Sequence, residues 1–207
     1  MASAPSSTGE LPRADGSPLP ESARDLVKIL VTGAFGVGKT TLIDSVSEIR
    51  PLHTEEHLTE ASVHVDDLDG VREKETTTVA IDFGRISLAG GIVLYLFGTP
   101  GQDRFRTLWD DISYGALGAL VLVDSRRIDA SFDVLGLVEE SGLPYAVAFN
   151  TFPDSPDHYT GEQLRAALDL APGTPLVTCD ARDAHSSVDA LLALVQHLID
   201  DQPTEAI

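Results

Sequence analysis

The sequence predicts an α/β protein with three layers, in which helices cover both faces of a mostly parallel β-sheet. Short apolar runs alternate with segments of helical periodicity along most of the chain. That alternation is typical of sheets assembled from strand–helix–strand units. The run GALVLVD at 118–124 is apolar almost without interruption, as expected for a strand that is buried on both faces. In such sheets, ligands bind at the carboxyl ends of the strands.

Each predicted element follows from a local pattern. Strands are expected where apolar and β-branched residues cluster, and helices where apolar residues recur every three or four positions. The predicted strands are 25–33, 78–88, 91–97, 118–124, 144–150 and 175–180. The predicted helices are 39–49, 132–141, 161–170 and 187–199. Because Ala89-Gly90 separates two strands, these strands are expected to form one antiparallel hairpin at the edge of the sheet.

Composition divides the chain into one domain and two tails. Residues 1–24 are rich in Ser, Pro, Gly and Ala, which predicts a disordered N-terminal tail. Residues 25–200 form the predicted domain, and residues 201–207 a short acidic C-terminal tail. The net charge of −19 excludes non-specific binding to nucleic acid or anionic lipid.

The cellular location is predicted from what the sequence lacks. It has no apolar run long enough to cross a bilayer and no signal-peptide pattern, so a cytoplasmic protein is expected. Cys179 is the single cysteine, which rules out a disulfide within the chain. We expect it to be a small buried residue.

The stretch GAFGVGKT matches the pattern G-x-x-x-x-G-K-[ST] in full, between a predicted strand and a predicted helix. In this motif the glycines turn backbone N–H groups toward nucleotide phosphates, the lysine reaches the outer phosphates, and the threonine hydroxyl binds Mg²⁺. The fold is therefore predicted to be that of a P-loop NTPase. The predicted nucleotide-binding residues of the loop are Gly33, Ala34, Phe35, Gly36, Val37, Gly38, Lys39, Thr40 and Thr41, of which Thr40 is also a predicted Mg²⁺ ligand.

Four blocks, GAFGVGKT, ETTTVAIDFGRI, LYLFGTPGQDRF and CDAR, resemble in this order the small Ras-like GTPases encoded in the conservon operons of actinobacteria. They are similar, more distantly, to MglA-like bacterial GTPases. The resemblance covers about residues 26–200 and implies a Ras-like G domain that alternates between GTP and GDP. It also implies a signalling complex with a roadblock-type protein and a sensor kinase-like membrane protein, through which the chain would reach a membrane.

The resemblance assigns roles to residues of the second and third blocks. Thr78 is the candidate for the threonine that binds Mg²⁺ and senses the γ-phosphate, with Thr76 and Thr77 as alternatives. Gln102 matches the glutamine that orients the attacking water in such enzymes. Gly101 matches the glycine whose N–H faces the γ-phosphate.

One position departs from the common pattern. Ras-like proteins usually carry, at the position of Gly98, an aspartate that binds Mg²⁺ through water. Either Asp82 or Asp124 replaces this carboxylate, or Mg²⁺ is held by Thr40, Thr78, phosphate and additional waters. In each case weaker Mg²⁺ binding is expected. A cationic group that stabilises the transferring phosphate has four candidates, none of them favoured: Arg72, Lys74, Arg104 and Arg106.

The residues that would select the base also depart from the pattern. The usual N-K-x-D reads FNTFPD here, so Asn150 is in register, Thr151 replaces the lysine, and Asp154 comes one residue late. Asp154 is the candidate for reading guanine, and Phe152 for covering the base or ribose. Within CDAR, the backbone N–H of Ala181 is the candidate donor to guanine O6.

Three histidines, His53, His57 and His64, lie in a polar stretch and are expected to be solvated rather than to bind a metal.

Taken together, the motifs predict a GTP-binding switch with slow hydrolysis, for which Gln102 is the main evidence. The alternative, a nucleotide-bound scaffold with little turnover, is favoured by Gly98. A third possibility, an enzyme that uses ATP, depends on the displaced Asp154.

Overall fold

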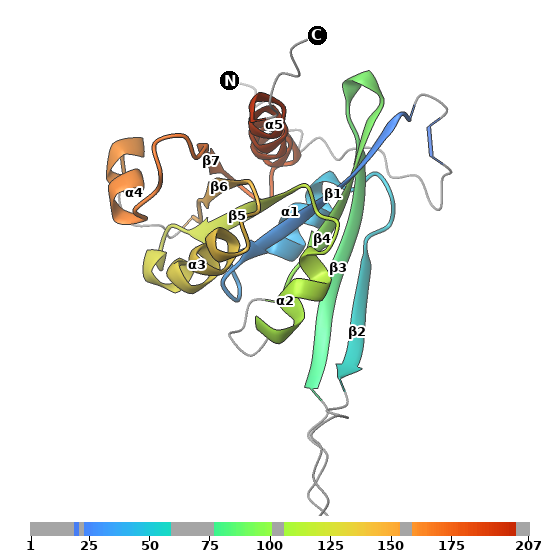
Figure 1. Cartoon of the computed structure of the whole chain (residues 1–207), viewed down its shortest axis with the longest axis horizontal. Helices are drawn as coiled ribbons and strands as arrows, with labels where there is room; N and C mark the ends of the chain where they lie inside the picture. Colours follow the sequence, from blue (N-terminus) through green and yellow to red (C-terminus); the bar gives the residue numbers. More distant parts are fainter. Residues whose placement is uncertain (1–18, 21–22, 59–76, 101–105, 154–158, 202–207) are drawn as a thin grey trace, which may run out of the picture.

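The computed structural model describes residues 19–20, 23–58, 77–100, 106–153 and 159–201. They form one seven-stranded sheet flanked by helices (Figure 1). The strands are β1 (Asp25–Gly33), β2 (Leu52–Leu58), β3 (Thr77–Ser87), β4 (Ile92–Gly98), β5 (Gly118–Asp124), β6 (Tyr145–Asn150) and β7 (Leu176–Cys179). The helices of more than one turn are α1 (Lys39–Val46), α2 (Arg106–Ser113), α3 (Phe132–Glu140), α4 (Gly161–Ala167) and α5 (Ala184–Asp200).

The sheet is mostly parallel, as predicted. Its strand order is β2-β3-β4-β1-β5-β6-β7. The pairings from β4 through β1, β5 and β6 to β7 are parallel, whereas β3 pairs antiparallel with both β4 and β2. The ends of β2 and β3 extend past the body of the domain, toward the bottom of Figure 1. The carboxyl ends of the parallel strands therefore lie at the same end of the sheet. Strand β3, which runs in the opposite direction, also contributes residues there.

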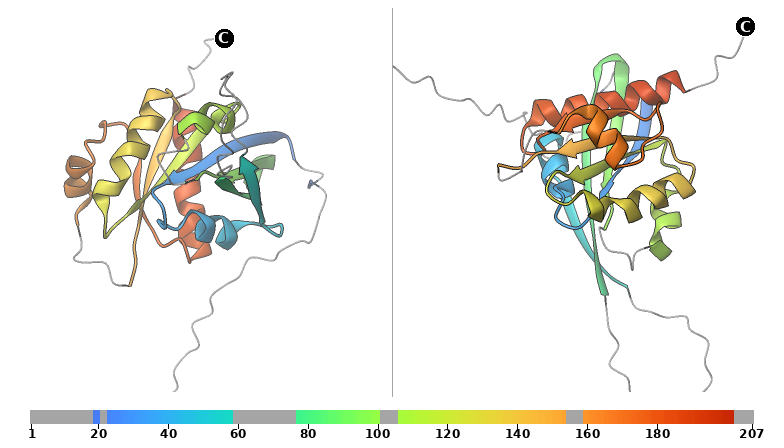
Figure 2. Two further views of the ribbon diagram at one scale, coloured as in Figure 1. Left: turned by 90° about the horizontal axis from the view of Figure 1, so that it is seen from below. Right: turned by 90° about the vertical axis from the view of Figure 1, so that its left-hand side faces the viewer.

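Two apolar clusters hold the helices against the sheet. One cluster joins α1 and α5 to one face, with Leu42, Ile43 and Leu191 fully buried. The other joins α2, α3 and α4 to the opposite face, where Trp109 and Leu164 are buried. All residues of β5 are buried, as predicted for a strand that is covered on both faces. The three layers can be followed in the two views of Figure 2.

Three local features differ from the sequence prediction. Residues 52–58 form β2 and residues 106–113 form α2, and neither element was predicted. The turn between β3 and β4 spans Ala89–Gly91, one residue longer than expected, because both Gly90 (φ 83°) and Gly91 (φ 87°) adopt a left-handed conformation. The other predicted elements agree with the structure to within three residues at each end.

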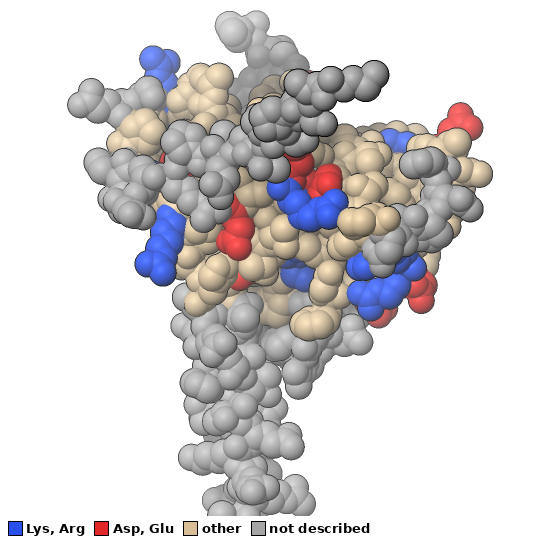
Figure 3. Space-filling model, turned by 180° about the vertical axis from the view of Figure 1, so that it is seen from behind, with Lys and Arg blue, Asp and Glu red and all other residues tan. Residues whose placement is uncertain are grey.

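The surface of the described residues carries mixed charges. On the face shown in Figure 3, basic side chains are scattered and several lie beside acidic ones. Ion pairs among the described residues include Arg182–Asp180 at 2.7 Å, which is partly exposed, and Arg85–Glu48 at 2.6 Å, in which the arginine is buried. Cys179 is fully buried, as predicted, and burial raises the pKa of its thiol. Within the described ranges, no helix has both the length and the apolar character needed to cross a membrane.

Candidate functional site

The phosphate-binding motif lies where the sequence predicts it, in the loop between the carboxyl end of β1 and the beginning of α1. Gly33 (φ 143°) and Gly38 (φ 106°) adopt backbone conformations that other residues rarely adopt. A Cβ atom on Gly33 would lie 2.4 Å from the carbonyl oxygen of Leu122. One on Gly38 would lie 2.8 Å from Nδ2 of Asn150. The packing of β5 and β6 against the loop thus requires glycine at both positions.

The side chain of Lys39 folds back over this loop. Its Nζ donates hydrogen bonds to the carbonyl oxygens of Gly33 (2.8 Å) and Ala34 (2.9 Å). Burial lowers the pKa of Lys39 to about 8, and the negative charge of Asp82 acts in the opposite direction. Phosphate groups bound in the loop would favour the charged amine. The lysine is therefore placed to exchange backbone carbonyls for phosphate oxygens.

Next to it, Thr40 contacts a carboxylate. Oγ1 of Thr40 donates a hydrogen bond of 2.5 Å to Oδ2 of Asp82. The second oxygen of Asp82 lies 2.8 Å from Nδ1 of His53 on β2. Nε2 of the same imidazole is 3.6 Å from Oδ1 of Asp44 on α1. His53 was expected to be solvated. Its side chain is half exposed, but it bridges two acids because the unpredicted strand β2 places it beside β3.

Of the two acids that the sequence offers in place of an aspartate at Gly98, only Asp82 contacts Thr40 in the structure. Asp124 ends β5 with its carboxylate buried, and Arg126 donates to both of its oxygens at 2.8–3.0 Å. Burial alone would raise the pKa of Asp124, but the hydrogen bonds and charge of Arg126, together with Arg127, hold it below its usual range. Asp124 is therefore the buried acceptor of an ion pair with Arg126, whose own side chain is partly exposed.

On the side of the site that is predicted to read the base, the side chain of Asn150 on β6 forms hydrogen bonds to two other segments. Its Nδ2 donates to the carbonyl oxygen of Val37 (2.8 Å) in the phosphate loop. Its Oδ1 accepts a hydrogen bond of 2.9 Å from the backbone N–H of Ala181, which follows β7. All three residues are buried. Since the N–H of Ala181 already has an acceptor here, its predicted contact with guanine O6 requires Asn150 to release it.

Two arginines that sequence reasoning did not single out lie at the mouth of the site. The guanidinium of Arg126 lies 3.7 Å from the ring centroid of Phe152, the residue predicted to cover the base or ribose. Nη2 of Arg127 donates to the carbonyl oxygen of Phe35 (3.0 Å) in the phosphate loop. The signal that could have found them is their position, directly after the carboxyl end of β5.

Thr78 lies within β3, opposite His57 of β2. It is four residues from Asp82 along an extended strand, which corresponds to roughly 13 Å. Because Asp82 contacts Thr40, a Mg²⁺ ligand at Thr78 requires the beginning of β3 to move. Thr77 begins the same strand. Seven predicted candidates lie outside the described residues, so their roles stay predictions: Arg72, Lys74, Thr76, Gly101, Gln102, Arg104 and Asp154. His64, which was expected to be solvated, also lies outside them.

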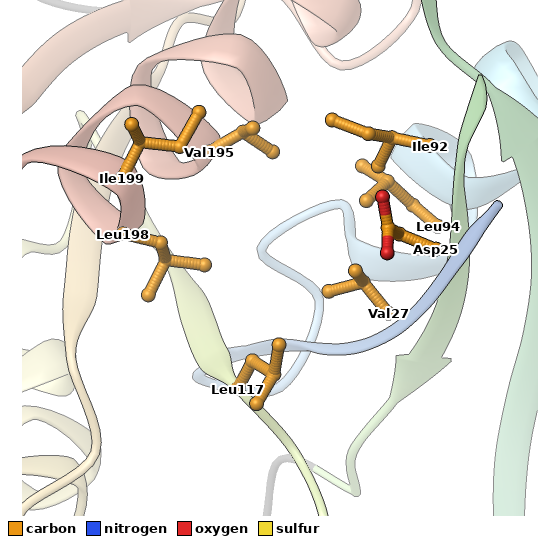
Figure 4. Close-up of a pocket in the computed structure, with 8 residues that line it drawn as sticks. All are labelled: Asp25, Val27, Ile92, Leu94, Leu117, Val195, Leu198 and Ile199. Atoms are coloured by element: carbon orange, nitrogen blue, oxygen red, sulfur yellow. The ribbon is translucent and has the colours of Figure 1, made fainter. Parts of the chain in front are cut away.

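An apolar cavity elsewhere in the molecule does not suit a nucleotide. It has a volume of about 340 Å³ and lies between α5 and the beginnings of β1 and β4 (Figure 4). Among the described residues that line it, Asp25 is the one that is charged, and it would repel phosphate; the others are Val27, Ile92, Leu94, Leu117, Val195, Leu198 and Ile199. Asp25 begins β1 and Gly33 ends it, so roughly 26 Å of strand separate this cavity from the phosphate loop.

Comparison with known proteins finds curated relatives that match part of this chain. Among curated relatives, the uncharacterized protein MJ1339 of Methanocaldococcus jannaschii is 30% identical over 129 residues, which cover 61% of this chain and 71% of that protein. The GTP-binding protein ypt2 of Schizosaccharomyces pombe is 34% identical over 102 residues, which cover 48% of this chain but only 41% of ypt2.

A solved structure and a family model extend these similarities over most of the chain. The FeoB G-domain from Methanococcus jannaschii matches with a TM-score of 0.58 and 15% identity, covering 86% of this chain and 100% of that one. This likeness concerns the fold alone. A family model described as conserved hypothetical ATP binding protein matches residues 31–201. This chain, with its three-layer P-loop fold, therefore belongs to that family of conserved hypothetical ATP-binding proteins.

Proposed function

We propose that this chain is a GTP-binding switch that hydrolyses GTP slowly and acts in a bacterial signalling complex. The observation that carries the proposal is the phosphate loop, in which Lys39 and Thr40 begin α1 directly after the glycine-rich turn. Backbone N–H groups and the Lys39 amine would bind the phosphates. The hydroxyl of Thr40 is a suitable Mg²⁺ ligand, and bound Mg²⁺ would neutralise charge on the outer phosphates.

Hydrolysis needs a water that is aligned with the γ-phosphate. In the proposed reaction this water attacks the γ-phosphorus, the bond to the β–γ bridging oxygen breaks, and GDP and inorganic phosphate leave. Gln102 would orient the water. The proposal of guanine rests on Asn150, on the CDAR segment that contains Ala181, and on the similarity to a GTP-binding protein. The family description names ATP instead, so ATP is compared with GTP in the hydrolysis measurement.

Replacing Gln102 with leucine is expected to slow GTP hydrolysis by about 10- to 100-fold, because the attacking water loses its orienting group. GDP affinity should stay unchanged. Phosphate release under single-turnover conditions, with GTP and with ATP, measures the effect. Gln196→Leu is the matched control, since Gln196 is exposed on α5. An unchanged rate in Gln102→Leu would make the chain a nucleotide-bound scaffold or assign the role to another residue.

Replacing Asp154 with asparagine is expected to reduce the preference for GTP over XTP by about tenfold. The carboxylate would accept hydrogen bonds from N1–H and the 2-amino group of guanine, and hydrogen bonds to a charged group contribute about 1.5–3 kcal/mol. Competition between the two nucleotides in equilibrium titrations gives the ratio. Asp189→Asn on the exposed face of α5 serves as the control. If both variants keep the wild-type ratio, Asp154 does not read the base.

We further propose that the chain binds a roadblock-type protein and, through it, a sensor kinase-like membrane protein. Support comes from the resemblance of the four sequence blocks to conservon-type GTPases. A switch binds its partner differently in its two nucleotide states. Complex formation with a purified roadblock-type protein, followed by size-exclusion chromatography, should therefore differ between the GDP-bound chain and the chain loaded with a non-hydrolysable GTP analogue. Equal binding in both states would contradict a switching role.

A further inference from the structure

We propose that Asp82 supplies the carboxylate that assists Mg²⁺ in this protein, and that His53 positions it. The inference rests on the proposed function, because it concerns the ion that accompanies the nucleotide. It assigns the missing acid of β4 to the neighbouring antiparallel strand β3. The carboxylate would thus come from β3 instead of β4, but it would lie in the same place relative to the phosphate loop.

The space at Gly98 supports this exchange. Gly98 and Asp82 are direct partners in the register of β3 and β4. A Cβ atom on Gly98 would lie 2.9 Å from Cβ and 3.1 Å from Oδ2 of Asp82, and 3.0 Å from Cδ1 of Ile43. The side chain of Asp82 therefore occupies the volume that a side chain at position 98 would need. One carboxylate fits between these strands, and in this sequence it belongs to β3.

The chemistry of Thr40 and Asp82 suits Mg²⁺. A hydroxyl group has one hydrogen to donate and two lone pairs. Thr40 can therefore offer a lone pair to the ion while its hydrogen remains bonded to Oδ2 of Asp82. Magnesium prefers one or two protein carboxylates combined with phosphate oxygens and waters. Among the described residues, no group of three or more potential ligands is arranged to hold a metal, so this pair would act together with the phosphates of a bound nucleotide.

His53 fixes the orientation of the carboxylate. Its Nδ1 lies 2.8 Å from Oδ1 of Asp82, the oxygen that does not contact Thr40. Partners of this kind orient metal-binding carboxylates, and their loss commonly lowers metal affinity. His53 belongs to β2 and Asp82 to β3. Mg²⁺ binding would therefore be linked to the paired strands β2 and β3 rather than to the end of β4.

The test measures how strongly Mg²⁺ slows the release of fluorescent GDP, as the ratio of the release rates in EDTA and in Mg²⁺. Asp82→Asn keeps the shape of the side chain and is expected to lower this ratio by about 10- to 100-fold, while the rate in EDTA stays near that of the wild type. Asp133→Asn on the exposed face of α3 is the matched control and should leave both rates unchanged. Titration with Mn²⁺, followed by electron paramagnetic resonance, should show the same loss of metal affinity.

A double variant that moves the carboxylate from β3 to β4 makes the test specific. The Gly98→Asp variant should be less stable than the wild type, because the new side chain clashes with Asp82. Asp82→Gly should lose the slowing of GDP release by Mg²⁺, and the double variant Asp82→Gly/Gly98→Asp should recover it. His53→Ala should lower the ratio by about 2- to 10-fold, as expected for the loss of one hydrogen bond, and His53→Gln, which keeps a donor, should lower it less.

The outcomes separate this inference from the proposed function. If wild-type protein binds GDP and Mg²⁺ slows its release, but Asp82→Asn responds to Mg²⁺ as the wild type does, the inference is wrong and the proposed function stands. If the wild type binds no nucleotide in EDTA or in Mg²⁺, both fail. If circular dichroism shows that the double variant Asp82→Gly/Gly98→Asp does not fold, the isosteric Asp82→Asn variant still decides the question.

Discussion

Replacing Lys39 with alanine is expected to weaken GDP and GTP binding by about 10- to 150-fold, the largest loss we expect from removal of a single side chain. The Lys39 amine contributes charged hydrogen bonds to phosphate oxygens, each of which is worth about 1.5–3 kcal/mol. It already lies within 2.9 Å of two carbonyl oxygens of the phosphate loop, so little reorganisation is needed. Isothermal titration calorimetry of nucleotide-free protein measures the loss.

Lys28→Ala provides the matched control for this variant. Lys28 lies on β1, the strand that leads into the phosphate loop, but its amine donates to the carbonyl oxygen of Tyr114 rather than to the loop. Nucleotide affinity should be unaffected there. Equal affinities of Lys39→Ala and the wild type would show that the nucleotide does not bind at the phosphate loop, and would remove the basis of the proposed function.

The second large effect concerns stability. Gly33→Ala is expected to lower the free energy of unfolding by about 2–5 kcal/mol, which combines an unfavourable backbone conformation with overpacking. The added Cβ would lie 2.4 Å from the carbonyl oxygen of Leu122 and 2.9 Å from Cγ1 of Val37, and Gly33 has a φ of 143°. Because the first of these contacts is backbone of the central strand β5, the loop has to shift. Urea unfolding measures the change.

A second glycine tests whether the site of the substitution matters. Gly136 lies within α3, and a Cβ built there has no atom within 4 Å. Gly136→Ala is therefore expected to stabilise the protein by about 0.5–1 kcal/mol, through its effect on helix propensity and the unfolded chain. If the Gly33→Ala and Gly136→Ala variants have the same free energy of unfolding, Gly33 of the phosphate loop does not pack closely against β5.

The parts of the fold that the sequence predicts are those with a strong local pattern. Strand β5 is apolar up to its last residue, Asp124, and buried throughout, so its limits could be predicted at both ends. Strand β2 could not, because LHTEEHL carries apolar residues only at its ends, Leu52 and Leu58. It lies at the edge of the sheet, where its pairing with β3 is the one that places it. Such pairing is non-local and leaves no periodicity to detect.

The choice between Asp82 and Asp124 shows the same limit at the site itself. Which residue faces Gly98 depends on the register of β3 and β4, and a turn that is longer by one residue moves every partner by one. With the predicted two-residue turn at Ala89-Gly90, Asp82 would have faced Phe97. The additional turn residue Gly91 brings Asp82 opposite Gly98. The phosphate loop needed no such information, because its motif contains both the conformation and the chemistry.

The measurement that tests the central claim most directly is the identity of the nucleotide released on denaturation of protein purified in the presence of Mg²⁺. Chromatography of the supernatant against guanine and adenine standards identifies it. The proposed GTP switch predicts guanine nucleotide, mostly GDP, in an amount close to that of the protein. Adenine nucleotide in the same proportion would contradict the account and assign the phosphate loop of this chain to ATP.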